Sequence, residues 1–162
     1  MDTRQQKNKS VSTDEWYTPK WIIDLLGSFD LDPCSPEHRP FDTANVHWTK
    51  QQDGLKMPWG KTEDVRVWLN PPYSRPLVEQ FIRKMADHNN GIALLVNRQD
   101  NVMWQEVIFP TAASMIFMRH RVQFLTLTVM LASRSLAAAL LRGVRKMIPS
   151  YAVVVSRVSM LF

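Results

Sequence analysis

The chain of 162 residues is long enough for one domain, and its hydrophobic content of 45% indicates a globular protein, which excludes a disordered one. The net charge of +5 arises from residues 127–162, which contain five basic and no acidic residues, so charge is weak evidence for nucleic-acid binding. A polar opening excludes a signal peptide or membrane anchor, and the single cysteine, Cys34, excludes an internal disulfide and an all-cysteine zinc site, so we expect a cytoplasmic protein without a membrane partner.

The N-terminal region predicts a flexible lead followed by one capped helix. Residues 1–13 are polar and are expected to form the lead. Thr18 as N-cap, Pro19 at the first helical position and Gly27 as C-cap predict a helix that continues to Leu26. The apolar residues between these caps recur at helical spacing, which favours an amphipathic helix.

Two short strands and a turn are expected next. Residues 29–34 alternate apolar and polar side chains before a proline, which is typical of a short strand. Residues 46–48 predict a second, brief strand, and the Asp-Gly pair at residues 53–54 predicts a turn. His38 and His47 are isolated from other ligand residues, so we expect no metal site.

A third strand is expected to end abruptly at two prolines. Residues 65–69 are β-branched and aromatic, as in a buried strand, and Asn70-Pro71-Pro72-Tyr73 follows them directly. Neither proline can donate a hydrogen bond to a sheet, so the strand must stop at Leu69 or Asn70. The next residues therefore form a stiff loop at the carboxyl end of the strand, where ligands bind in open α/β sheets.

This loop suits chemistry at a planar amine, whose nitrogen is a poor nucleophile because its lone pair is delocalised. The Asn70 side-chain oxygen and the Pro71 carbonyl oxygen can each accept one amine hydrogen, which frees the lone pair. Tyr73 offers a flat face on which a planar base can stack. The alternative is a proline-stiffened turn with Tyr73 packed in the core. The candidate catalytic residues are Asn70, Pro71, Pro72 and Tyr73.

Helices and strands alternate in the chain that follows. The expected elements are helices at residues 77–86 and 104–109, the second ended by Pro110, and strands at residues 91–96, 113–118 and 121–125. The run 91–96 is continuously apolar, as in a parallel strand that is buried on both faces. This alternation predicts an α/β fold with a mostly parallel sheet.

The sequence Asn-Pro-Pro-Tyr at residues 70–73 resembles motif IV of amino-group methyltransferases that use S-adenosylmethionine. Together with Asp14-Glu15-Trp16-Tyr17-Thr18-Pro19, it makes residues 14–125 resemble the small phage-type DNA adenine methyltransferase (Dam-like) family. The resemblance implies a compact Rossmann-like methyltransferase domain over residues 14–126, with S-adenosylmethionine as the methyl donor. It implies action on the exocyclic amine of an adenine that is flipped out of double-stranded DNA.

The same resemblance implies which residues contact the cofactor. Three stretches look like motifs X, I and III of the family, and their residues are Trp16, Tyr17, Thr18, Pro19, Asp32, Pro33, Cys34 and Asp53. Where many relatives of the broader class carry a glycine-rich loop, this chain has Ser35-Pro36-Glu37. From the residues alone, a capped helix is the favoured explanation of the first stretch. A small buried cysteine and an Asp-Gly turn explain the other two equally well.

Ser74 and Arg75 follow the motif directly and are the candidates for holding the target DNA strand. Arg98 and Gln99 follow the strand at residues 91–96 and reach the same sheet edge, but solvated loop residues are commoner there. Two alternatives stay open. The chain can methylate protein glutamine or RNA amines, because Asn-Pro-Pro-Tyr also occurs in enzymes with those substrates. It can also be an inactive, decayed phage-gene product. The recognition sequence, cytosine as a target and the oligomeric state also stay open.

Residues 127–162 do not share the resemblance. Residues 127–144 are apolar with scattered arginines, and Arg134 interrupts a span that would otherwise suit a membrane helix. Residues 151–155 are strand-like. Codons for residues 126–132 can be read one base back as Pro-Asp-Gly-Asn-Ala-Gly, which is the polar turn expected of the family. We therefore hypothesise that the gene shifts frame near Thr126, which would remove the final strand and leave a sheet edge uncovered.

Overall fold

The computed structural model describes residues 17–118, 122 and 124, together with the backbone of residues 151–156. The elements in chain order are α1 (Lys20–Leu26), β1 (Leu31–Asp32), β2 (Val46–His47), β3 (Val67–Leu69), α2 (Leu77–His88), β4 (Gly91–Val96), the π-helix η1 (Trp104–Ile108), α3 (Phe109–Thr111), β5 (Ser114–Phe117) and β6 (Tyr151–Ser156). None of the helices in this described part is long and apolar enough to cross a membrane.

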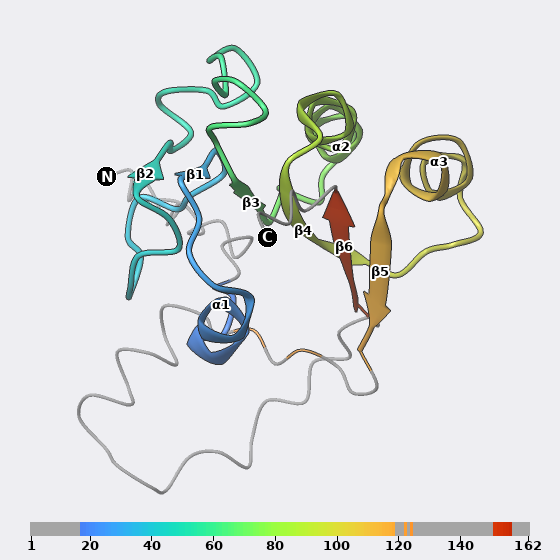
Figure 1. The fold of residues 1–162 in the computed structure, drawn as a ribbon, viewed down its shortest axis with the longest axis horizontal. Helices are drawn as coiled ribbons and strands as arrows, with labels where there is room; N and C mark the ends of the chain where they lie inside the picture. The colour runs from blue at the N-terminus through green and yellow to red at the C-terminus, as the bar shows by residue number, and fades with distance from the viewer. Residues whose placement is uncertain (1–16, 119–121, 123, 125–150, 157–162) are drawn as a thin grey trace, which may run out of the picture.

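Six strands form one sheet in the order β2-β1-β3-β4-β6-β5 (Figure 1). Strands β2, β1, β3 and β4 are parallel to one another. Strand β6 is antiparallel to both of its neighbours, so β5 again runs in the direction of β4. The sheet is thus mostly parallel, and the expected α/β fold is confirmed.

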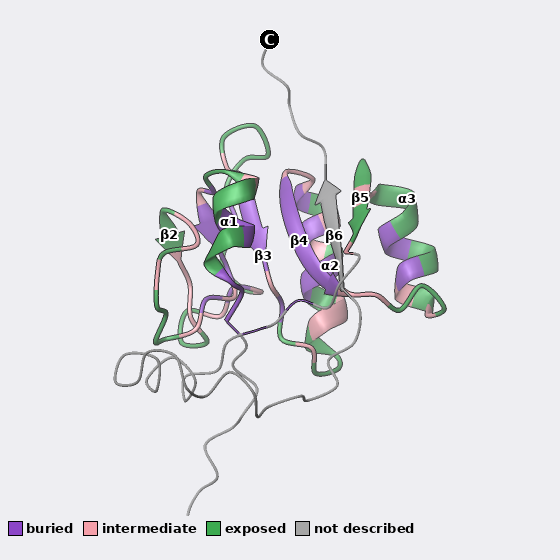
Figure 2. Ribbon diagram, turned by 90° about the horizontal axis from the view of Figure 1, so that it is seen from below, coloured by how far each residue is buried: buried purple, intermediate pink, exposed green. Residues whose placement is uncertain are grey.

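The central strands are buried on both faces, as the apolar run at residues 91–96 predicted (Figure 2). In β3, Val67 and Leu69 pack in one core cluster and Trp68 in the other. Strand β4 alternates in the same way, with Ala93 and Leu95 in the first cluster and Ile92 and Leu94 in the second. Because successive side chains of a strand point to opposite faces, the sheet separates two apolar layers.

Helices cover both faces of the sheet. The first cluster contains side chains of α2 and η1, and the second contains Ile22 and Ile23 of α1, so α1 lies on the face opposite α2 (Figure 1). Helix α1 begins at Lys20 with Pro19 in the N-cap position and without a side-chain cap. The prediction of Thr18 as N-cap is therefore wrong, and the Thr18 hydroxyl contacts Asn70 instead.

Two later elements differ from their predictions. The helical segment at 104–109 does not end at Pro110, because that proline lies within α3, which continues directly from η1. Of the strand expected at residues 121–125, only Val122 and Phe124 are described, and neither is in a strand. Both side chains are buried in the α1 cluster.

Strand β6 lies between β4 and β5 and pairs with β4 over six residues. The strand-like pattern at residues 151–155 is therefore confirmed, and the loss of the final strand that the frame-shift hypothesis implied is not observed. Residues 125–150 and 157–162, which carry most of the proposed frame-shifted segment, lie outside the described residues.

Candidate active site

The loop after β3 begins where the sequence places it. Strand β3 ends at Leu69, Pro71 is fully buried, and Asn70 is half-buried between them. Leu69 pairs with Ala93 of β4, so Asn70 lies level with Leu94 at the carboxyl ends of two parallel strands. This edge is where open α/β sheets bind ligands.

Hydroxyl groups contact the Asn70 side chain on two sides. Asn70 Nδ2 donates a hydrogen bond to Thr18 Oγ1 at 3.3 Å. The Tyr73 hydroxyl lies 3.2 Å from Asn70 Oδ1 and 2.9 Å from the carbonyl oxygen of Leu94. An amide oxygen has two lone pairs, so Asn70 Oδ1 has the capacity to accept a second hydrogen bond beside that of the Tyr73 hydroxyl.

Asp32 fixes the loop that follows β1. Its carboxylate is buried and accepts hydrogen bonds from the backbone N–H of Cys34 at 3.0 Å and from Thr43 Oγ1 at 2.5 Å. Burial raises the pKa of Asp32 to about 6, although both hydrogen bonds oppose that shift. Burial also raises the pKa of the Cys34 thiol well above its usual value, so the thiol is protonated at neutral pH.

The turn at Asp53 packs directly on this loop. A Cβ atom at Gly54 would lie only 2.1 Å from the Pro33 carbonyl oxygen, so only glycine permits this close approach. The Asp53 carboxylate accepts a hydrogen bond from the Leu55 N–H and is paired with Lys56 at 2.8 Å. The hydrogen bond to Lys56 is the main cause that lowers the pKa of Asp53, so this partly exposed side chain is ionised at neutral pH.

The geometry thus gathers most of the predicted site residues at one edge. Strands β1 and β3 are neighbours, so the Pro33–Cys34 loop and the Asn70 loop emerge side by side. Tyr17 and Pro19 are buried next to Thr18 in sequence, and Trp16 lies outside the described residues. Pro72 is exposed, as are Ser74 and Arg75, which extend the same loop to the surface; Arg75 Nε lies 3.8 Å from Glu79 Oε1.

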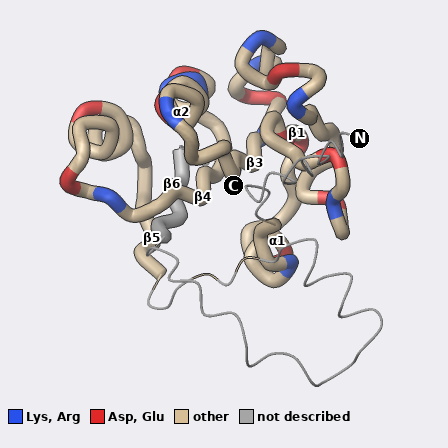
Figure 3. Tube along the Cα trace, turned by 180° about the vertical axis from the view of Figure 1, so that it is seen from behind, with Lys and Arg blue, Asp and Glu red and all other residues tan. Residues whose placement is uncertain are grey.

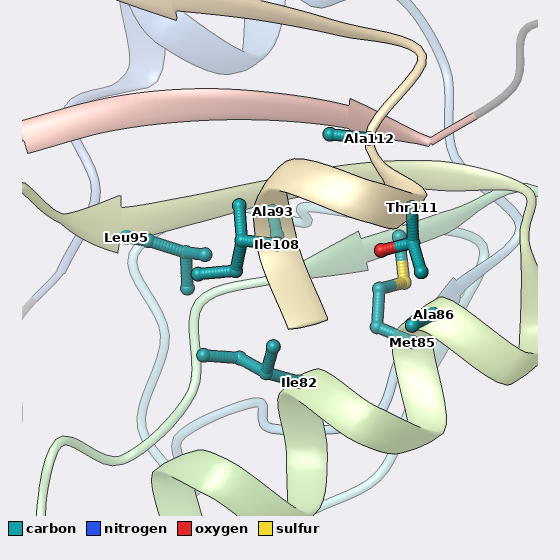
Figure 4. A pocket seen from close by; sticks show the side chains of 8 residues that line it. All are labelled: Ile82, Met85, Ala86, Ala93, Leu95, Ile108, Thr111 and Ala112. Atoms are coloured by element: carbon teal, nitrogen blue, oxygen red, sulfur yellow. The ribbon is translucent and has the colours of Figure 1, made fainter. Parts of the chain in front are cut away.

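Two other features of the described residues carry no chemistry. A small cavity between α2, β4 and η1 has an almost wholly apolar lining, formed by Ile82, Met85, Ala86, Ala93, Leu95, Ile108, Thr111 and Ala112 (Figure 4). The hydroxyl of Thr111 donates to the Val107 carbonyl oxygen. Basic and acidic residues are interspersed along helices and loops (Figure 3), and within the described part no three metal-ligating side chains form a cluster.

Sequence reasoning missed three residues that support this edge. Thr43 and Leu94 gave no local signal, because their roles depend on contacts between distant segments. Lys84 gave a weak local signal: it lies three residues after Phe81, so it borders the apolar stripe of α2 that faces the protein. Its ammonium group donates to three backbone carbonyl oxygens of the segment after Asp53.

Comparison with known proteins finds relatives of this chain. The profile of a family described as DNA N-6-adenine-methyltransferase (Dam) matches residues 5–159, and so includes most of the segment 127–162 that was left outside the resemblance. The chain is 34% identical over 110 residues to a DNA N-6-adenine-methyltransferase of Escherichia phage T1, an alignment that covers 64% of this chain and 44% of that relative. The chain thus matches less than half of that relative's length. No solved structure matches it.

Proposed function

Because the chain belongs to the DNA N-6-adenine-methyltransferase (Dam) family, we propose that it methylates the exocyclic amine of adenine in double-stranded DNA, with S-adenosylmethionine as methyl donor. The observation that carries the proposal is the Asn70 loop, which places the Asn70 amide and the Tyr73 ring together at the carboxyl end of β3. DNA as the substrate and a cytoplasmic location follow from the family and are part of the proposal.

The residues at the neighbouring edge suit the methyl donor. Asp53 offers an ionised, partly exposed carboxylate, which can accept hydrogen bonds from the hydroxyl or amine groups of an adenosine. Pro33 and Cys34 offer backbone groups in a loop that Asp32 holds in place. When bound, S-adenosylmethionine supplies an electrophilic methyl group.

Asn70 and Pro71 prepare the target amine. Asn70 Oδ1 and the Pro71 carbonyl oxygen each accept one amine hydrogen, which shifts the nitrogen lone pair from the ring toward the incoming methyl group. The two prolines limit movement of the backbone, and Thr18 holds the Asn70 amide nitrogen. No general base is needed first, because the nitrogen releases its proton readily only after it is alkylated.

Tyr73 receives the flipped base. Its ring is partly buried against the α1 cluster, and its hydroxyl reaches the Leu94 carbonyl oxygen, so one side of the ring is anchored. Stacking on the remaining surface offsets the few kcal/mol that flipping an adenine out of the duplex costs. Ser74 and Arg75, exposed beyond Tyr73, are placed to contact the DNA backbone.

Methyl transfer tests the proposal directly. Purified protein is incubated with S-adenosylmethionine and unmethylated duplex DNA, and the digested nucleosides are analysed by mass. We expect N6-methyl-2′-deoxyadenosine as the product, whereas a methylated deoxycytidine, or methylation found only when RNA or protein replaces DNA, would overturn the assignment.

Asn70→Ala tests the role of the central residue in the same assay. We expect turnover to fall by about a hundredfold or more, because the loop loses an acceptor that acts in the transition state. Cofactor affinity, measured by calorimetry, should stay within about twofold of wild type, a change of roughly 0.4 kcal/mol. Equal losses of turnover and cofactor affinity would mean that Asn70 is a structural residue.

A further inference from the structure

Lys84 of α2 is partly exposed, and its charged group reaches the segment that follows Asp53. Its Nζ donates to the carbonyl oxygens of Gly54 at 3.1 Å, Leu55 at 2.7 Å and Met57 at 2.7 Å. An ammonium group has three hydrogens, so these three acceptors use its full donor capacity. A surface lysine would ordinarily keep this group in water, so the arrangement indicates that the amine has a specific task.

Trp59 contacts both the turn and Lys84. Its buried indole donates from Nε1 to the Gly54 carbonyl oxygen at 2.8 Å, and Lys84 Nζ lies 5.3 Å from the centre of its ring. The Gly54 carbonyl therefore accepts from two side chains on different segments. Together these groups tie the turn at residues 53–57 to α2.

The turn needs such support because its backbone is strained. Asp53 has φ of 56°, a left-handed conformation that a non-glycine residue adopts at an energetic cost. Its neighbour Gly54 is pressed against the Pro33 carbonyl oxygen. A strained turn keeps its shape only where surrounding groups fix it, and Lys84 donates three hydrogen bonds to this one.

We propose that Lys84 is a positioning residue for cofactor binding. Through its hydrogen bonds to the turn, Lys84 holds the Asp53 carboxylate and the Pro33 loop in the arrangement that receives an adenosine group. The inference rests on the proposed function, because it takes Asp53 to be a cofactor contact. Lys84 acts through the turn and touches neither the methyl donor nor the target base.

Lys84→Met tests this inference, because methionine keeps an unbranched apolar stem beside Trp59 but donates no hydrogen bond. We expect the Kd of S-adenosylhomocysteine, measured by calorimetry on the whole chain, to rise about tenfold. Turnover at saturating S-adenosylmethionine should change less than about twofold, since the Asn70 loop is untouched. Hydrogen exchange at the amides of residues 53–57 should become faster. Arg83→Met, on the exposed side of the same helix turn, is the matched control and should bind as wild type does.

A double mutant separates positioning from general destabilisation. In an Asp53→Asn background, Lys84→Met should weaken binding much less than it does alone, because both changes then act on one contact. Lys84→Arg, which keeps donors, should recover part of the affinity. Unchanged affinity in Lys84→Met, or fully additive losses in the double mutant, would overturn the inference. If wild type itself fails to bind S-adenosylhomocysteine, the proposed function fails instead.

Discussion

At the scale of single residues, the candidate site depends on which atom of Asn70 faces the target. The amide nitrogen is held by Thr18 and the amide oxygen lies beside the Tyr73 hydroxyl. An oxygen acceptor is useful only in this orientation, because an amide turned by half a rotation would present a donor to the amine. Thr18 therefore contacts the proposed catalytic loop, although the sequence resemblance assigns it to the cofactor pocket.

Thr18→Val should separate these two roles. Valine matches threonine in shape but cannot accept the Asn70 hydrogen bond, so we expect turnover to fall about five- to tenfold, the worth of about one hydrogen bond. Cofactor affinity should change little, and Thr18→Ser should retain activity. A large rise in cofactor Kd with unchanged turnover would instead support the cofactor role.

The raised pKa of Asp32 predicts a pH dependence of stability. Because its pKa is about 6 in the folded protein against 3.8 ordinarily, the folded state binds more protons than the unfolded chain between these values, and stability falls as pH rises through them. This group should make the protein about 1 kcal/mol more stable at pH 5 than at pH 7.

Urea unfolding at the two pH values measures the effect, with Asp32→Asn as the control. Asparagine can accept from Cys34 and donate to Thr43 but does not titrate. The pH dependence should therefore be smaller in the variant. An identical pH dependence in the two proteins would show that other groups cause it.

At the scale of elements, β6 determines whether the sheet is continuous. Strand β6 is hydrogen-bonded on both sides, to β4 and to β5, whereas β5 is the edge strand among the described residues. Proline cannot donate to a ladder and is tolerated mainly on edge strands. The two neighbouring strands should therefore differ sharply in their tolerance of proline.

Val154→Pro and Ile116→Pro make this comparison. We expect Val154→Pro in β6 to cost at least about 3 kcal/mol and to produce aggregation, because the β4 edge loses its partner. Ile116→Pro in β5 should be milder. Thermal melting followed by circular dichroism, with size-exclusion chromatography, distinguishes the two, and equal melting temperatures would contradict the observed strand order.

Elements with a strong local pattern could be predicted from the sequence. The apolar run of β4, the stop at Asn70-Pro71 and the amphipathic face of α2 each depend on neighbouring residues, and all three were found where expected. Contacts between distant segments could not be predicted, because no pattern relates Thr18 to Asn70 or Lys84 to the turn at Asp53. The end of α1 was predicted and its start was not, since the Thr18 side chain bonds across the fold rather than along the helix.

At the scale of the whole molecule, β6 limits the frame-shift hypothesis. A strand at residues 151–156 and a family match that runs to residue 159 both argue for an intact reading frame there. A shift near Thr126 therefore requires a second one that restores the frame before Tyr151. Sequencing the gene should reveal, in the alternative frame, an open stretch that encodes Pro-Asp-Gly after residue 125. A stop codon in that stretch would end the hypothesis.

The position of β6 also has a consequence for synthesis on the ribosome. Strands β4 and β5 emerge early, but the strand that joins them is translated after a further 33 residues, 118–150. Until then the nascent chain exposes an unpaired β4 edge, and the sheet depends on contacts of high sequence separation, which form slowly. Slower translation lengthens this exposed interval, so expression of the protein should depend on chaperone supply during elongation.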